Sequence, residues 1–280
     1  MKKIFAFCNQ KGGVGKTTSV VNISAALADK GYKVLVIDVD SQANATSGLG
    51  EEKPATHEFT TYQLIVENSD IQPMIRKTAF ENLYLIPSNT DLSGVELELI
   101  SRERREYALK DRLAVLKSQF DFILMDCPPS LGLLTINALT AADAIIIPLQ
   151  CEYYALEGLS QLLSTHQLVQ KNLNPELEIG GVILTMADFR TNLTQQVIEE
   201  VKNYFKEKVF EAIIPRTVKL SEAPSFGKPA IIYDPHNRGS KNYLAIAQEF
   251  IKRFAAGIKS ENSNEPAPPV ETVSAEENAQ

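Results

Sequence analysis

The sequence has little of the chemistry that builds disulfide frameworks or metal centres. Its 280 residues include only three cysteines and three histidines. Cys8, Cys127 and Cys151 are odd in number and widely spaced, which does not suggest a disulfide framework. The histidines are scattered and lack metal-ligand spacing. We therefore expect small buried cysteines and solvated or hydrogen-bonded histidines.

Long hydrophobic runs are also absent. No apolar stretch is long enough to span a bilayer. Only the five apolar residues 4–8 separate the initial Met-Lys-Lys from a glycine-rich loop, so a strand is expected there rather than a signal peptide. No internal repeat of solenoid period is present. A chain of this length can bury a substantial core, and we expect a cytoplasmic protein with a single domain over residues 1–258.

The last residues lack positive charge. Residues 260–280 contain no lysine or arginine and few large apolar side chains. Such a composition cannot bury enough surface to offset the entropy of ordering, so we expect residues 259–280 to be a disordered acidic tail. The tail holds five glutamates, and subtracting their charge from the net charge of −7 leaves −2. Overall acidity is therefore no argument against DNA binding by the remaining residues.

Apolar runs alternate with helix-like segments along the chain. Strands are expected at residues 4–8, 32–37, 83–87, 122–125, 144–149 and 180–185. Helices are expected at residues 18–30, 92–117, 155–173, 192–208 and 243–254, with short helices covering the site between residues 51 and 80. This alternation predicts an α/β fold with a doubly wound, mostly parallel sheet covered by helices on both faces.

Residues 11–18, with the sequence KGGVGKTT, are the most informative stretch. They lie between a predicted strand and a predicted helix. Glycines allow successive backbone N–H groups to converge on a phosphate, and the helix adds its free N–H groups and positive dipole end. We expect Lys16 to reach the β- and γ-phosphates and Thr17 to place its hydroxyl on Mg²⁺. The predicted nucleoside triphosphate contacts are Lys11, Gly12, Gly13, Val14, Gly15, Lys16, Thr17 and Thr18.

The loop departs from the usual P-loop spacing. Gln10 stands where that spacing requires glycine, and an additional cation, Lys11, follows it. Lys11 has a function only if a phosphate lies within its reach. The alternative is a solvated surface lysine.

Acidic residues follow two of the predicted strands. Asp38 and Asp40 end the run at residues 32–37, and strand alternation places both on the same side of the chain. Asp126 closes the run at residues 122–125. Ligand sites of parallel sheets lie at the carboxyl ends of strands, so Asp126 is expected to bind Mg²⁺ through water and Asp38 is a weaker metal candidate. Any one of these acids alone could instead be a helix cap or turn residue.

Five motifs together resemble those of the ParA/Soj chromosome- and plasmid-partitioning ATPases, which are P-loop NTPases with a deviant Walker A motif. They are KGGVGKTT at 11–18, DVDSQANATSGLG at 38–50, DCPPS at 126–130, IPR at 214–216 and LSEAPSFGKP at 220–229. The similarity extends from about residue 2 to about residue 255. It implies ATP or ADP and Mg²⁺ as ligands.

The resemblance also implies residue roles at the phosphates. Lys11 matches the signature lysine, which contacts phosphate across a nucleotide-sandwich dimer, and Gly12 matches the glycine that allows this close approach. Asp40 matches the acid tied to hydrolysis, which orients the attacking water. The catalytic candidates are therefore Lys11, Lys16 and Asp40.

Further roles concern the base and DNA. Pro215 matches the segment that lines adenine, and Thr217 stands where the family often has asparagine. Arg190 and Lys219 match positions at which the family holds DNA. The remaining candidates for a basic patch are Arg216, Lys228, Arg238, Lys241, Lys252 and Arg253. No recognition-helix motif is present, so any DNA binding should be independent of base sequence.

The implied function is ATP-dependent DNA partitioning near the nucleoid. An ATP-bound homodimer would bind double-stranded DNA and be released by hydrolysis that a ParB-type centromere-binding partner stimulates, with no membrane involved. One alternative is a MinD-like membrane-associated ATPase, which ends in a basic amphipathic helix, whereas this chain ends in acidic residues. Another is a non-catalytic nucleotide-dependent regulator, against which Asp40 argues. Cys127 as an iron–sulfur ligand is a disfavoured alternative to a small buried residue.

Overall fold

The computed structural model describes residues 3–56, 58–152 and 155–256 of the chain. The predicted acidic tail lies outside these residues. The described residues form a seven-stranded sheet with the order β3-β4-β2-β5-β1-β6-β7. The strands are β1 (Ile4–Phe7), β2 (Val34–Asp38), β3 (Arg76–Lys77), β4 (Leu83–Ile86), β5 (Phe122–Asp126), β6 (Ala144–Gln150) and β7 (Glu178–Thr185).

All neighbouring strands are parallel except the short edge strand β3, which runs antiparallel to β4. The register aligns the ends of the central strands. Phe7 pairs with Asp126, and Asp126 also pairs with Asp38 on the other side of β5. The residues that follow β1, β2 and β5 therefore leave the sheet at one edge, where parallel sheets bind ligands.

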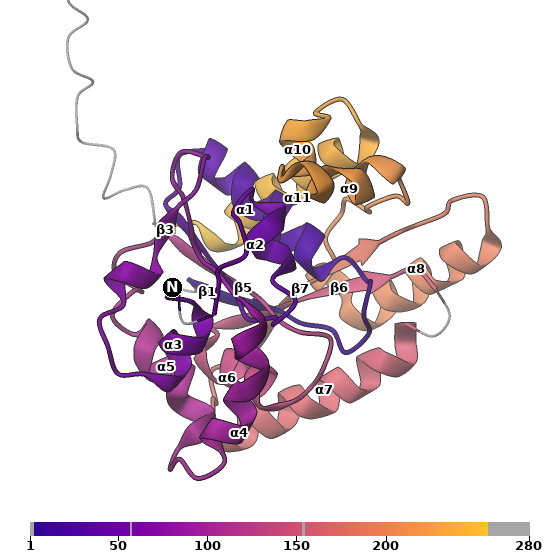
Figure 1. Cartoon of the computed structure of the whole chain (residues 1–280). Helices are drawn as coiled ribbons and strands as arrows, with labels where there is room; N and C mark the ends of the chain where they lie inside the picture. The colour runs from indigo at the N-terminus through magenta and orange to yellow at the C-terminus, as the bar shows by residue number, and fades with distance from the viewer. Residues whose placement is uncertain (1–2, 57, 153–154, 257–280) are drawn as a thin grey trace, which may run out of the picture.

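Helices cover both faces of the sheet (Figure 1). On one face lie α1 (Lys16–Asp29), α10 (Ala230–Tyr233) and α11 (Arg238–Phe254), with α2 (Asn44–Gly48) and α9 (Val218–Glu222) nearby. The other face packs against α3 (Thr61–Val66), α4 (Val95–Leu99), α5 (Ala108–Leu113), α6 (Leu133–Ala141), α7 (Ala155–Asn172) and α8 (Asn192–Phe205). The mostly parallel, doubly wound sheet is thus confirmed.

Strand alternation divides the core into two layers. Phe5 and Phe7 of β1 belong to the layer beneath α1 and α11, whereas Ile4 and Ala6 belong to the layer on the other face. The last helix packs on the core as predicted. Its side chain at Tyr243 is buried, and its apolar stripe continues through Ala247, Ile251 and Phe254.

The expected helix over residues 92–117 is wrong. The structure has separate pieces there: η2 (Thr90–Gly94), α4, η3 (Arg105–Tyr107) and α5. Arg104 adopts a left-handed backbone with φ of 54°, which a continuous right-handed helix excludes. Helix boundaries also differ elsewhere. The last helix begins at Arg238 instead of 243, because the Asn237 side chain accepts a hydrogen bond from the Gly239 N–H and caps it.

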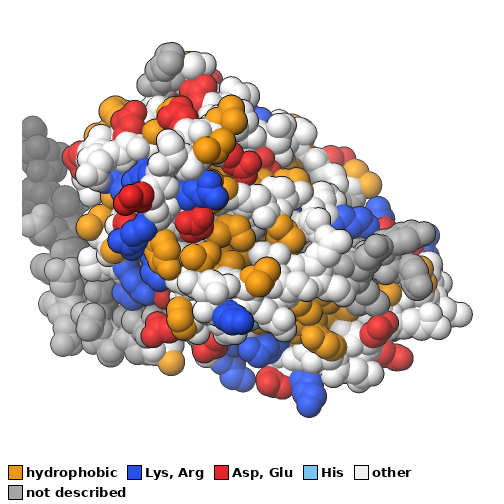
Figure 2. Space-filling view, turned by 90° about the horizontal axis from the view of Figure 1, so that it is seen from below, with side chains coloured by type: hydrophobic (Ala, Val, Ile, Leu, Met, Phe, Trp, Pro, Cys, Tyr) orange, Lys and Arg blue, Asp and Glu red, His pale blue; other side chains and the backbone are white. Residues whose placement is uncertain are grey.

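The face of the molecule that contains α4 and α7, seen from below, has hydrophobic side chains near its middle with Lys and Arg around them (Figure 2). Helices α4 and α7 carry the exposed apolar side chains Leu97 and Leu168 respectively. Within the described residues, no helix combines the length and apolarity needed to cross a bilayer.

Phe250→Ala should cost about 3–5 kcal/mol of unfolding free energy. Phe250 is fully buried and its ring contacts four others, those of Phe5, Phe122, Phe210 and Phe254. Removing it leaves a cavity that rigid neighbours cannot fill. Urea denaturation followed by circular dichroism measures the change, with the exposed Tyr204→Ala as a control that should cost less than about 1 kcal/mol.

Candidate functional site

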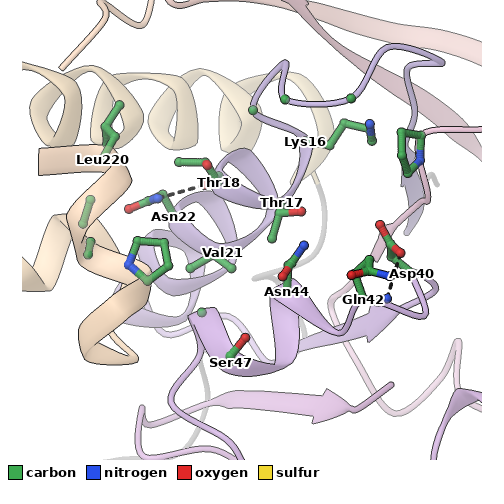
Figure 3. A pocket seen from close by; sticks show the side chains of 18 of the residues that line it. Lys16, Thr17, Thr18, Val21, Asn22, Asp40, Gln42, Asn44, Ser47 and Leu220 are labelled. Atoms are coloured by element: carbon green, nitrogen blue, oxygen red, sulfur yellow. Dashed lines mark hydrogen bonds between the residues drawn. The ribbon is translucent and has the colours of Figure 1, made fainter. Parts of the chain in front are cut away.

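A cleft of about 410 Å³ opens at the carboxyl ends of the central strands. The loop after β1 and the start of α1 form one wall, and α2 with the segment after α9 forms another (Figure 3). Lys16, Thr17 and Asp40 all line the cleft. The structure thus brings together side chains that the sequence placed after two different strands.

The glycine-rich loop has the backbone conformation that phosphate binding requires. Gly13 and Gly15 have φ of 72° and 89°, which L side chains rarely adopt. Helix α1 begins at Lys16 with no side-chain cap on its first turn, so its N–H groups are available to an anion. The Thr185 hydroxyl donates to the Val14 carbonyl at 2.8 Å and anchors the loop to the end of β7.

Lys16 is almost completely buried, with 6% of its surface exposed. Its Nζ donates to the Lys11 carbonyl at 3.1 Å. Burial lowers the pKa of Lys16, and the charge of Asp126 opposes that shift. An ammonium group withdrawn from water in this way gains most from a strongly anionic partner.

Thr17 and Asp126 form the pair expected for a magnesium site. The Thr17 hydroxyl donates to Asp126 Oδ2 at 2.7 Å. The other oxygen, Asp126 Oδ1, is buried and has no hydrogen-bond partner among the described residues. Burial, and after it the charge of Asp38, raises the pKa of Asp126 well above its usual range. A hydroxyl oxygen and a carboxylate oxygen that accepts no hydrogen bond are ligands that suit a hydrated divalent cation, so these residues fit Mg²⁺.

Asp38 and Asp40 lie close together but have different environments. Asp38 is fully buried, and its Oδ2 accepts bonds from the Thr46 N–H and hydroxyl, both at 2.8 Å. Burial raises the pKa of Asp38 to about 6. Its Oδ1 accepts from the Asp40 N–H at 3.2 Å. Asp38 therefore orders the loop, whereas Asp40 faces the cleft and accepts from the Gln42 N–H (Figure 3).

Lys11 makes a contact that the sequence did not predict. Its Nζ lies 3.4 Å from Glu152 Oε2, and Arg216 Nη2 lies 2.9 Å from Glu152 Oε1. Position 12, next to Lys11, would have room for a larger residue within this chain, because a Cβ added to Gly12 would meet only Pro129 at 3.8 Å.

A second cavity of about 180 Å³ adjoins the first and is lined by Pro215 and Thr217. The two cavities share five lining residues: Gly15, Thr18, Met186, Leu220 and Pro224. Met186 has φ of 52°, a strained conformation for a residue other than glycine.

The motif at 220–229 forms a wall of the first cleft, a role that the sequence analysis did not assign. Leu220, Pro224 and Lys228 line the cleft. Gly227 packs directly on Gly50, and a Cβ on Gly50 would lie 2.8 Å from the Gly227 carbonyl oxygen. The two walls thus meet backbone to backbone beyond α2.

The comparisons with known proteins agree with this geometry. Residues 2–179 match the AAA domain family. The chain is 58% identical over 249 residues to the sporulation initiation inhibitor protein Soj of Bacillus subtilis, covering 89% of this chain and 98% of that protein. It is 51% identical over 251 residues to the chromosome partitioning protein ParA of Myxococcus xanthus, covering 90% and 88%. The chain belongs to the ParA/Soj family of partitioning ATPases.

A solved structure extends the match to three dimensions. The cobyrinic acid a,c-diamide synthase of Mycobacterium smegmatis, with bound ADP and magnesium, superposes with a TM-score of 0.79 at 36% identity. The match covers 92% of this chain and 97% of that one. The P-loop NTPase fold predicted from the ParA/Soj motifs is confirmed.

Two of the cations that the ParA/Soj resemblance singles out are held in ion pairs. Arg190 donates to both carboxylate oxygens of Asp188, at 2.8 and 2.6 Å, and lowers the pKa of Asp188 to about 2. Lys219 Nζ donates to Glu222 at 2.9 Å. Both basic side chains remain substantially exposed to solvent.

Contacts join three segments that carry basic candidates: residues 187–190, 216–219 and 237–238. The Arg216 N–H donates to the Ala187 carbonyl, and the Arg238 guanidinium lies 5.2 Å from the Phe189 ring centre. The cations gathered by these segments are Arg190, Arg216, Lys219 and Arg238; we call them the basic cluster. Arg253 does not belong to it. Its side chain is largely buried against Phe210 and donates to backbone carbonyls.

None of the described cysteines or histidines lines either cavity. Cys8, Cys127 and Cys151 are buried and free of disulfides. His166 is buried against the Leu177 carbonyl, and His57 lies outside the described residues. Within the described ranges, no three His, Cys, Asp or Glu side chains are grouped as metal ligands.

Proposed function

We propose that this chain is an ATP-dependent DNA-partitioning ATPase that hydrolyses ATP to ADP and phosphate with Mg²⁺. One observation carries the proposal. The Thr17–Asp126 pair, with a buried and unpartnered carboxylate oxygen, lies beside the start of α1 and the buried Lys16. A cation-binding pair next to an anion-binding helix start is what a magnesium–triphosphate complex requires.

Different residues of the two cavities would bind the phosphates, the Mg²⁺ ion and the adenine of ATP. Backbone N–H groups of residues 12–18 and the Lys16 ammonium would hold the phosphates. The Thr17 hydroxyl would bind Mg²⁺, and Asp126 would assist through a bound water. Bound Mg²⁺ would neutralise phosphate charge. The second cavity, with Pro215 and Thr217, receives the adenine. The ADP and magnesium in the Mycobacterium smegmatis protein support this assignment.

Asp40 is the proposed catalytic carboxylate, and Lys11 the proposed link between two copies. Asp40 lines the cleft and would orient the attacking water as a hydrogen-bond acceptor. The Lys11 side chain would extend to a phosphate of the nucleotide bound to a second copy, so that ATP favours a homodimer. A Cβ added at Gly12 would make no close contact within one chain, so the need for glycine there would come from the second copy, for which it leaves room.

Dimerisation would join two basic clusters and strengthen non-specific binding to duplex DNA, because two linked weak contacts gain from effective concentration. Hydrolysis, stimulated by a ParB-type centromere-binding partner, would release the dimer from DNA. We place this cycle in the cytoplasm at the nucleoid. The DNA and partner steps rest on the chain's membership of the ParA/Soj family.

The experiment is ATPase turnover measured with and without duplex DNA and a peptide from a candidate ParB-type partner. We expect slow basal turnover that requires Mg²⁺ and rises when both additions are present. ATP binding without turnover under every condition would instead favour a non-catalytic nucleotide-dependent regulator.

Arg190→Glu combined with Lys219→Glu should weaken duplex binding in ATP by on the order of tenfold or more. Both side chains would contact phosphates, and charge reversal replaces attraction with repulsion. Fluorescence anisotropy with a labelled duplex, repeated at several salt concentrations, measures the affinity. The dependence on salt should also become shallower.

Lys77→Glu combined with Lys171→Glu is the matched control, because it changes the charge equally at exposed lysines outside the basic cluster. Lys77 lies on β3, at the opposite edge of the sheet from β7. Equal loss of affinity in both double variants would show a general effect of net charge and would reject the basic cluster as the DNA site.

A further inference from the structure

Glu152 lies just beyond β6 and joins two parts of the site that are distant in sequence. Its carboxylate accepts three donors: Gln150 Nε2 at 2.6 Å and Arg216 Nη2 at 2.9 Å on Oε1, and Lys11 Nζ at 3.4 Å on Oε2. None of the ParA/Soj motifs recognised in the sequence includes this residue.

The three contacts are unequal. Oε1 is held by two donors at 2.9 Å or less, and one of them, Gln150, is a buried side chain at the end of the sheet. Oε2 has the longer contact with Lys11 alone among the described residues. Lys11 can therefore leave while Gln150 and Arg216 keep the carboxylate in place.

The backbone of the loop reinforces this arrangement. The Asn9 side chain donates to the Pro148 carbonyl at 2.8 Å and accepts from the Lys11 N–H at 3.0 Å. The segment carrying Lys11 is thus fixed to the strand that leads to Glu152. Only the long, flexible lysine side chain must move for the ion pair to open.

We propose that Glu152 is an autoinhibitory latch on Lys11. This inference rests on the proposed function, in which Lys11 contacts phosphate in a second copy. When the Lys11 side chain extends to a phosphate of another copy, its ammonium group moves away from the carboxylate of its own chain. The latch therefore favours the monomer until ATP bound to a second copy offers its γ-phosphate, which is a more strongly charged partner than a single carboxylate.

The size of the effect follows from the exposure of the pair. The side chains of Lys11 and Glu152 are 36% and 43% exposed. Ion pairs at this exposure shift an equilibrium by about twofold to fivefold. Because a symmetric dimer opens two latches, removing both should tighten the dimer by about fourfold to twenty-five-fold. The affinity of the dimer in ADP should increase much less, because no γ-phosphate is present to bind the Lys11 ammonium.

The test uses Glu152→Gln, which removes the charge but keeps a side-chain oxygen for Gln150. Dimerisation in ATP without DNA is measured by sedimentation velocity, with Asp40→Ala present in every chain to prevent hydrolysis. We expect the dimer dissociation constant to fall by about fourfold to twenty-five-fold and this gain to shrink at high salt. Glu58→Gln, which breaks the exposed Arg76 pair, is the matched control and should change nothing.

An unchanged or weaker dimer for Glu152→Gln would overturn the latch, since a supporting role predicts loss rather than gain. Glu152→Asp provides a second variant, because its shorter side chain should give a smaller gain in the same direction. If the parent chain with Asp40→Ala forms no dimer in ATP at all, the proposed function itself fails. That result is distinct from a parent that dimerises and a latch variant that shows no gain.

Discussion

Lys11→Ala should abolish ATP-driven dimerisation and leave nucleotide affinity partly intact. In the structure, Lys11 offers the phosphate cleft only its backbone carbonyl, which accepts from Lys16 and survives the substitution. Its ammonium group points instead to Glu152. Losing that group removes the proposed contact with the second copy, while the loop backbone and Lys16 still hold the phosphates. Sedimentation velocity in ATP and nucleotide titration calorimetry measure the two quantities.

The control is Lys30→Ala, which removes an exposed lysine at the end of α1 away from the cleft. Its ATP dimer should form normally. A normal dimer for Lys11→Ala would disprove the trans contact of this lysine and leave the dimerisation mechanism without its central residue. Loss of all nucleotide binding would instead assign Lys11 a role within its own chain.

Asp40→Ala should lower ATP turnover by about 10²–10⁴-fold, the range expected when a positioned acid–base group is lost. Asp40 lines the cleft, and its contact with the Gln42 N–H fixes its orientation. Binding of ATP should survive, because the phosphate loop and the Thr17–Asp126 pair are separate from this side chain. Phosphate release under saturating ATP measures turnover, and the ATP-bound dimer should accumulate.

Asp70→Ala is a suitable comparison, since Asp70 is an exposed aspartate outside both cavities. It should turn over ATP at the unsubstituted rate. Unchanged hydrolysis by Asp40→Ala would remove Asp40 from the catalytic assignment. Equal loss of binding and turnover would indicate that its contribution is to fold the loop after β2.

The sequence predicted the local parts of the site well. Strand, glycine-rich loop and helix are continuous in the chain, and backbone sterics at Gly13 and Gly15 follow from residue type. The common edge for Asp40 and Asp126 follows from parallel pairing, which alternating strands and helices imply. The fold class and its two helical layers were accessible for the same reason.

Other features depend on tertiary contacts that no local pattern encodes. Lys11 and Glu152 are 141 positions apart, and their pairing requires the P-loop and the end of β6 to be placed together. Lys228, an exposed candidate for the basic patch, also lines the cleft. The apolar and charged pattern at residues 92–117 indicated one helix. It did not show the left-handed turn at Arg104 that separates the short pieces.

The contact between Gly50 and Gly227 has a consequence for the order of events. The walls beyond α2 meet there backbone to backbone, and a Cβ on either glycine would lie less than 3 Å from the main chain of the other. If a second copy covered the opening of the cleft, spent ADP would have no exit while the two copies stayed together. In that case the subunits would have to separate before fresh ATP could bind, and every round of the proposed cycle would pass through the monomer.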